Sequence, residues 1–265
     1  MSDLLSLSSP FLIEPGHYSW EVPDGWQQGR GAFGGLVLAA LVRTLEHALA
    51  DPARPMRTLT ATLCGPVDVG PARVEVELLR GGSGLTALAA RLVQRGEVRT
   101  HTVGLFGGDR VRDGAWCDVK APPMPDWRAL PAAAIVPPLA PVFAPAFEFR
   151  PTVGLPYASG AEAVTEGWIR ARHPGPARDA AFLAAHADAW WPAMLTTLSA
   201  PRPAATVSYS LEIVGDFEGL DADVPLYHTG RSPIAAGGYA VEFRELWGAD
   251  GRLLALNQQT FAIIR

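Results

Sequence analysis

The chain contains the same series of elements twice. Residues 16–23 read GHYSWEVP and residues 167–174 read GWIRARHP, each a short strand-like run that ends in proline. In both halves an apolar helix rich in small residues follows, and then come strands that end in a long hairpin, turning near Gly96 in the first copy and Gly251 in the second. Matching landmarks lie roughly 150 residues apart, a spacing that indicates a duplicated domain rather than a solenoid.

Each copy predicts one helix packed on an antiparallel sheet, which makes the fold class α+β. The helices are expected from their apolar spacing at residues 35–50 and 179–198. The strands are expected at residues 57–63, 72–80, 86–95 and 98–106 in the first copy, and at 204–214, 223–228, 238–247 and 252–264 in the second. Pro192 lies inside the second helix, so the helix should kink or restart there, because proline cannot donate the required hydrogen bond.

Proline content divides the chain into domains. The segment 108–146 is rich in proline, which prevents regular helices or ladders and keeps a chain extended. We therefore predict an N-terminal unit at residues 1–107, a linker at 108–146 and a C-terminal unit at 147–265.

Composition limits the classes of function. Of the 265 residues, 48% are hydrophobic and the net charge is −5, so the chain can bury a large core and offers no basic patch for nucleic acid. The longest apolar stretch, residues 33–42, is too short to cross a bilayer, and the N-terminus lacks signal-peptide features. We expect a cytoplasmic protein with no membrane partner.

Several familiar motifs fail in context. Residues 29–34 (GRGAFG) fit the glycine pattern of dinucleotide sites, but the buried strand before it and the acidic residue about 20 positions later are missing. No G-x-S-x-G is present, since residues 81–85 read GGSGL. Cys64 and Cys117 form no CxxC pair, and the six histidines are scattered. We therefore predict neither a cofactor nor a metal.

Three polar positions in the second copy stand out. Asp188 lies beside the predicted helix break, Thr206 near the start of the next strand and Gln259 on the last strand. A helix packed across a sheet can bring such positions together, and a hydrolase without metal needs a carboxylate to take a proton and neutral groups to hold water. Taken singly, each residue has an ordinary explanation, such as capping of freed backbone groups by the Asp. The first helix has no carboxylate in its apolar middle.

The chain resembles double-hotdog acyl-CoA thioesterases of the acyl-CoA thioesterase II type. The likeness covers nearly the whole chain and rests on GRGAFGGLVLAAL in the first half and on AAHADAWWPAM, ATVSYSLEI and DGRLLALNQQTFAIIR in the second. It implies two tandem helix-on-sheet units that form one continuous sheet, hydrolysis of an acyl-CoA to free acid and CoA, and assembly as a homodimer or larger oligomer.

The resemblance also implies residue roles. Asp188, Thr206 and Gln259 match the residues that orient the hydrolytic water, although Ser208 could replace Thr206 on the same strand face and Gln258 adjoins Gln259. Binding of substrate is expected at Gly34, Gly35, Trp190 and Ser208. Backbone N–H groups at a helix N-terminus would stabilise the oxyanion. Trp26, Phe33, Trp190 and Trp191 are candidates for an acyl tunnel, and Arg30, Arg57 and Arg80 for contacts to CoA phosphates.

Two other functions stay open from the sequence. One is a non-catalytic acyl or acyl-CoA binding protein whose site has decayed. The other is a hotdog enoyl-CoA hydratase, because Asp223 and His228 have the D-x4-H spacing of those enzymes, although here the pair follows the helix instead of opening it. Acyl chain length and head group cannot be read from the sequence.

Overall fold

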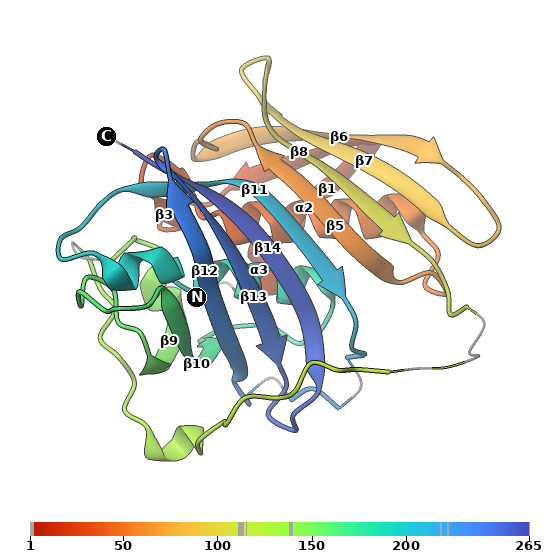
Figure 1. The fold of residues 1–265 in the computed structure, drawn as a ribbon. Coiled ribbons are helices and arrows are strands. Elements are labelled where there is room, and N and C mark those ends of the chain that lie inside the picture. The colour runs from red at the N-terminus through yellow and green to blue at the C-terminus, as the bar shows by residue number, and fades with distance from the viewer. Residues whose placement is uncertain are drawn as a thin grey trace.

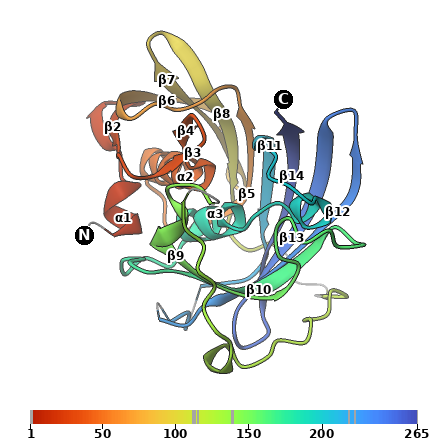
Figure 2. The same cartoon turned by 90° about the vertical axis from the view of Figure 1, so that its left-hand side faces the viewer.

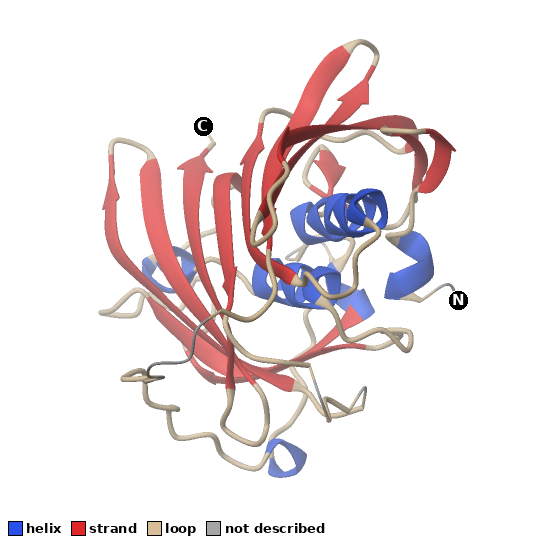
Figure 3. Cartoon of the chain, turned by 90° about the vertical axis from the view of Figure 1, so that its right-hand side faces the viewer, coloured by secondary structure: helices blue, strands red, loops and turns tan. Residues whose placement is uncertain are grey.

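A computed structural model describes residues 3–110, 114, 116–137, 140–217, 219–221 and 223–264. Within them, twelve strands form one antiparallel sheet that curves around the helices α2 (Gly34–Leu49) and α3 (Ala180–Ala189) (Figures 1 and 2). Both helices lie on the same face of the sheet (Figure 3). The arrangement is the predicted continuous sheet with one helix from each copy.

The order of strands repeats in mirror fashion about the centre of the sheet. The first copy supplies β1 (Phe11–Glu14), β2 (His17–Val22), β6 (Gly70–Arg80), β7 (Thr86–Gln94), β8 (Glu97–Phe106) and β5 (Met56–Leu63). The second continues with β11 (Ala204–Ile213), β14 (Leu253–Ile263), β13 (Tyr239–Trp247), β12 (Leu226–Ala236), β10 (Val164–Ala171) and β9 (Phe147–Val153). The copies join where β5 and β11 pair antiparallel, with Leu211 opposite Leu59.

The remaining elements are short. They are α1 (Leu4–Leu7), the two-stranded ribbon β3 (Gln27–Gln28) and β4 (Gly31–Ala32), and the 3-10 helices η1 (Trp127–Ala129), η2 (Ala144–Ala146) and η3 (Ala193–Thr197). The proline-rich linker contributes η1 and η2, while its residues 111–113, 115, 138 and 139 lie outside the described part. The domain boundaries proposed at residues 107 and 147 stay a prediction.

The prediction for the second helix is wrong about its length. In place of one helix over residues 179–198, α3 ends at Ala189 and a 3-10 turn, η3, follows Pro192. Trp190 is already extended, with φ −74° and ψ 147°, and Trp191 precedes a proline, which disfavours the helical region. The predicted restart at Pro192 is confirmed.

Two further predictions need correction. The strand expected at residues 223–228 begins at Leu226 and runs to Ala236, because Asp223 lies in a turn. The repeat landmark at residues 167–174 is a strand that starts earlier, at Val164, and ends at Ala171. The edge strands β1 and β9 were not predicted from the sequence.

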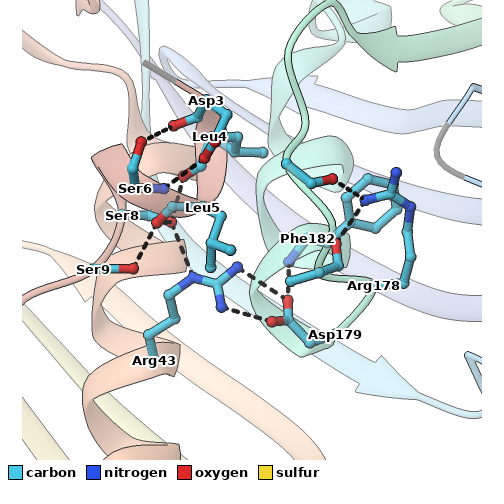
Figure 4. Close-up of polar contacts among 12 residues, drawn as sticks. Asp3, Leu4, Leu5, Ser6, Ser8, Ser9, Arg43, Arg178, Asp179 and Phe182 are labelled. Carbon is cyan, nitrogen blue, oxygen red and sulfur yellow. Dashed lines mark hydrogen bonds and ion pairs between the residues drawn. The ribbon is translucent and has the colours of Figure 1, made fainter.

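Helix α3 is buried on all sides, since all ten of its residues are buried, as expected for a uniformly apolar helix. It packs antiparallel to α2. At one end of the pair, Arg43 of α2 forms an ion pair with Asp179, the N-cap of α3, with Nη1 and Oδ2 2.6 Å apart (Figure 4). Asp179 also accepts the N–H of Phe182, and Arg43 Nε donates to Ser8 Oγ. One carboxylate therefore joins the two copies and caps a helix.

We expect Asp179→Ala to lower the free energy of unfolding by about 1–3 kcal/mol, because it removes the cap and leaves Arg43 without its counter-charge. Asp179→Asn should lose less, since the amide oxygen still caps the helix. Asp126→Ala is the matched control, because Asp126 caps the short exposed helix η1. Urea unfolding measures all three, and equal losses for Asp179→Ala and Asp126→Ala would contradict the joining role.

Candidate active site

Asp188 lies at the last turn of α3 and faces the first turn of α2. The backbone N–H of Gly35 donates a hydrogen bond to its carboxylate. A Cβ atom at Gly34 would approach Asp188 Oδ2 to 2.8 Å, closer than a carbon can lie without displacing the carboxylate. The glycines at the start of α2 therefore let the helix N-terminus, which carries partial positive charge, reach Asp188.

The three predicted polar residues form one chain of hydrogen bonds. Gln259, on β14, donates to the carboxylate of Asp188, and Thr206 Oγ1, on β11, donates to Gln259 Oε1 over 3.1 Å. Gln259 Nε2 also donates to Asn257 Oδ1 over 3.0 Å. Asp188 and Gln259 are buried, with 7% and 1% of their surface exposed. The structure thus brings together the residues that the sequence picked from three elements.

A β-bulge decides between the neighbouring candidates. The pairing of β11 with β14 shifts between Thr206 and Ser208, and such a bulge reverses the alternation of side chains. Thr206 consequently points inward to Gln259, while Ser208 is exposed. The prediction that Ser208 shares a strand face with Thr206 is wrong, and so Ser208 cannot take the place of Thr206. Gln258 is exposed as well, which leaves Gln259 as the amide beside Asp188.

Burial is the main influence on the Asp188 carboxyl and raises its pKa, because the charged form loses water. The Arg244 guanidinium and the hydrogen bonds from Gly35 and Gln259 oppose this shift without cancelling it. A carboxylate with raised pKa and neutral donors is a better base than one in water. The site therefore has the electrostatics of a proton acceptor.

The side chain of Trp190 contacts other residues of the protein interior. Its Nε1 donates to Thr165 Oγ1 at 2.5 Å, and its ring stacks on His228 with centroids 5.0 Å apart. The other proposed tunnel aromatics also lie in the core, where Phe33 stacks on Phe143 at 3.9 Å. A substrate contact of Trp190 stays a prediction.

Asp223 and His228 do not form a buried acid–base pair. Asp223 is exposed in a turn, whereas His228 is fully buried on β12. Burial, together with the nearby Arg244, holds the pKa of His228 well below its usual range, so the imidazole is neutral. This geometry gives no support to a hydratase site at these two residues.

Sequence reasoning missed two charged residues next to Asp188. Glu242 and Arg244 of β13 are 0% and 1% exposed and lie on the inner face of the sheet. Their sequence context, VEFREL, alternates like a strand that buries its apolar side chains and exposes its charged ones. In the structure Glu242 lies opposite Gln259 in the register between β13 and β14, a pairing that the sequence alone does not reveal.

The candidate phosphate contacts differ in position. Arg57 lies at the start of β5 and bonds to the carbonyl of Gly107, about 20 Å along the strand from the end that faces Gly34. Arg30 is exposed in the ribbon turn just before α2, and Arg80 is exposed at the end of β6. Arg30 is thus the candidate nearest to the first turn of α2.

The described residues contain no group of three or more His, Cys, Asp or Glu side chains placed to hold a metal ion. No helix in the same residues is long and apolar enough to cross a membrane. Cys64 and Cys117 are free and exposed.

Family models match both halves of the chain. The model of the acyl-CoA thioesterase N-terminal domain matches residues 22–107, and that of the acyl-CoA thioesterase C-terminal domain matches residues 118–263. The chain belongs to the acyl-CoA thioesterase family. No curated protein matches it.

Solved structures show the same fold. A conserved protein of unknown function with a hot dog fold from Alicyclobacillus acidocaldarius is 24% identical, with a TM-score of 0.88 over 99% of this chain and 98% of that one. An acyl-CoA thioesterase II from Mycobacterium marinum is 21% identical, with a TM-score of 0.79 over 98% of both chains. The predicted double-hotdog fold is confirmed.

We expect Asp188→Asn to stabilise the protein at high pH. Because the pKa of Asp188 is raised on folding, the wild-type free energy of unfolding should fall as pH rises from about 4, the pKa in the unfolded chain, through the folded pKa. The Asn variant lacks this decline, so its advantage should be absent below pH 4 and full above the folded pKa. Urea unfolding across pH measures it. Asp118→Asn, at an exposed position, is the control, and equal curves for Asp188→Asn and wild type would contradict the assignment.

Proposed function

We propose that this protein hydrolyses acyl-CoA thioesters, with Asp188 as general base and with Thr206 and Gln259 placing the attacking water. The observation that carries the proposal is the chain of hydrogen bonds from the buried Asp188 through the buried Gln259 to the half-buried Thr206. Membership of the acyl-CoA thioesterase family supports the substrate class.

The chemistry follows from the groups present. Asp188 accepts a proton as water attacks the thioester carbonyl carbon, which forms a tetrahedral intermediate with an oxyanion. Collapse of that intermediate breaks the carbon–sulfur bond, and the proton held by Asp188 goes to the departing CoA thiolate. The free acid and CoA are the products.

The first turn of α2 supports the charge that develops. Its N–H groups and the positive end of the helix lie beside Asp188. Oriented donors of this kind stabilise an oxyanion, and removal of one such donor from a hydrolase costs about 2.7–4 kcal/mol of transition-state stabilisation. Because the N–H of Gly35 already donates to Asp188, substrate binding by the backbone of Gly34 and Gly35 stays a prediction. Assembly as a homodimer or larger oligomer and a cytoplasmic location stay predictions.

We expect Asp188→Asn to lower kcat at least about 100-fold, because the amide cannot accept the proton of water. Gln259→Ala and Thr206→Val should also lower kcat, since they remove the groups that place the water, and Thr206→Ser should restore activity. Release of free CoA from a panel of acyl-CoAs is the measurement.

The exposed neighbours Gln258 and Ser208 provide matched controls. Gln258→Ala should keep the wild-type rate, and Ser208→Ala should keep the wild-type kcat, since the predicted contact of Ser208 with substrate would change KM instead. If the parent protein binds acyl-CoA without releasing CoA, the chain is a binding protein with a decayed site instead. If Asp188→Asn keeps full activity, Asp188 is not the base.

A further inference from the structure

A buried ion pair lies beneath the broken end of α3. On β13, Arg244 Nε donates to Glu242 Oε1 over 2.7 Å, and both side chains are buried. Arg244 also lies near enough to Asp188 to stabilise its charged form. The hydrolysis steps described above use neither residue.

Each member of the pair holds one side of the helix break. Arg244 Nη1 donates to the carbonyl of Ala187 over 2.7 Å, and Glu242 Oε2 accepts the N–H of Ala193 over 2.7 Å. Ala187 directly precedes Asp188, and Ala193 opens the turn after Pro192. Carbonyls at a helix C-terminus lack partners inside the helix. The ion pair therefore fixes the backbone on both sides of Asp188 and the break.

The internal duplication shows what the fold itself requires at these positions. Matching bulges, between Met56 and Thr58 on β5 and between Thr206 and Ser208 on β11, align the two copies. In this alignment the row Tyr209, Gln259 and Glu242 corresponds to the row Leu59, Gly104 and Leu88.

The first copy fills the equivalent places with apolar side chains. Leu88 stands where the second copy has Glu242, and Ala90, two residues further, where it has Arg244. Both are buried. Because a buried ion pair loses much of its attraction to desolvation and is often replaceable by apolar residues at no cost in stability, the architecture does not account for Glu242 and Arg244.

We propose that Glu242 and Arg244 are positioning residues that hold Asp188 against the first turn of α2 and set the charge balance around its carboxylate. The inference rests on the proposed role of Asp188. It assigns to the pair a task that the first copy, with apolar side chains in these places, does not perform.

The groups around Asp188 determine the direction in which its pKa should shift when Glu242 or Arg244 is replaced. Helix α2 offers the N–H of Gly35, and β14 offers the neutral Gln259. Burial keeps the neighbouring Tyr209 neutral, by raising its pKa well above the usual value, and lowers that of His228 on β12. His186, on α3 itself, is buried, with its pKa lowered to about 4.

Glu242 and Arg244 on β13 are therefore the charged neighbours whose replacement should shift the pKa of Asp188. Arg244 lowers the pKa of Asp188. Burial is the main cause that raises the pKa of Glu242, and repulsion from the Asp188 charge adds to it. Removal of the guanidinium should raise the pKa of Asp188, and removal of the Glu242 charge should lower it.

The test is a titration of the Asp188 carboxyl by carbon-13 NMR in the full chain, with Asp188→Asn identifying the signal. Alongside it, the pH dependence of kcat is measured. We expect Arg244→Met to move both midpoints upward by about one pH unit or more, which is a tenfold change in the ionised-to-protonated ratio. Glu242→Gln should move them downward, and Arg244→Lys should return them toward wild type. A purely structural pair would not produce opposite shifts.

Two controls keep the result decisive. Arg73→Met breaks an exposed pair with Glu75 and should leave both midpoints unchanged. Glu242→Leu/Arg244→Met installs apolar residues like those of the first copy, so it should unfold cooperatively, with kcat reduced about tenfold or more through loss of positioning and KM within about twofold. Unchanged midpoints in both single variants, or an unchanged kcat in the double variant, would overturn the inference.

The two proposals fail in different ways. Full activity of Asp188→Asn removes the proposed base, yet the NMR titration still shows whether the pair controls the Asp188 carboxyl. Loss of activity in Asp188→Asn, combined with unshifted midpoints in the β13 variants, leaves the base in place and removes the role of the pair.

Discussion

The antiparallel contact between α2 and α3 determines where this protein can bury a reactive charge. The first turn of α2 faces the last turn of α3, and the N-cap of α3 faces Arg43 in the second half of α2. Gly34 and Gly35 meet Asp188 at one end, and Asp179 meets Arg43 at the other. Both contacts follow from the antiparallel packing of one helix from each copy.

The two ends differ in the chemistry of the partner. Asp179 forms a direct ion pair with Arg43, which also bonds to Ser8, so its charge is neutralised at 2.6 Å. Asp188 receives uncharged donors from Gly35 and Gln259, and Arg244 holds the preceding carbonyl. A carboxylate in direct contact with arginine is a poor base, whereas a buried one with neutral donors keeps its affinity for protons. Under the proposed mechanism, the helix pair therefore has one carboxylate paired with arginine and one that takes the proton of water.

Much of the fold could be predicted from the sequence because its signals are local. Apolar spacing gave α2, and the hairpin turns near Gly96 and Gly251 located the long strands. The edge strand β9 (Phe147–Val153) was missed because it follows a proline-rich segment, and the extent of α3 was misjudged because its apolar spacing continues past Ala189. Those boundaries depend on backbone conformations that a periodic pattern does not reveal.

The candidate site could be predicted in part. Asp188, Thr206 and Gln259, which the structure brings together, were selected because a helix break and a family resemblance both pointed to them. Ser208 was placed on the wrong face, since one bulge residue reverses the alternation of a strand and leaves no mark in composition. That the side chains of Glu242 and Arg244 face the core could not be predicted from the sequence, for a related reason.

On β13 the usual burial pattern is inverted: Phe243 is 43% exposed, while its charged neighbours Glu242 and Arg244 face the core. A shift of one residue would exchange these faces and bury the phenyl ring. Pairing with β14 opposes that shift. Beyond the charged stretch, Leu246 is buried in the main core, whereas Trp247 is buried in a separate cluster with Trp168 and Tyr227, against which linker residues pack. The sheet thus imposes the polar register. The register is tolerable because each charge meets a backbone group that the broken helix leaves unpaired: the carbonyl of Ala187 for Arg244, and the N–H of Ala193 for Glu242.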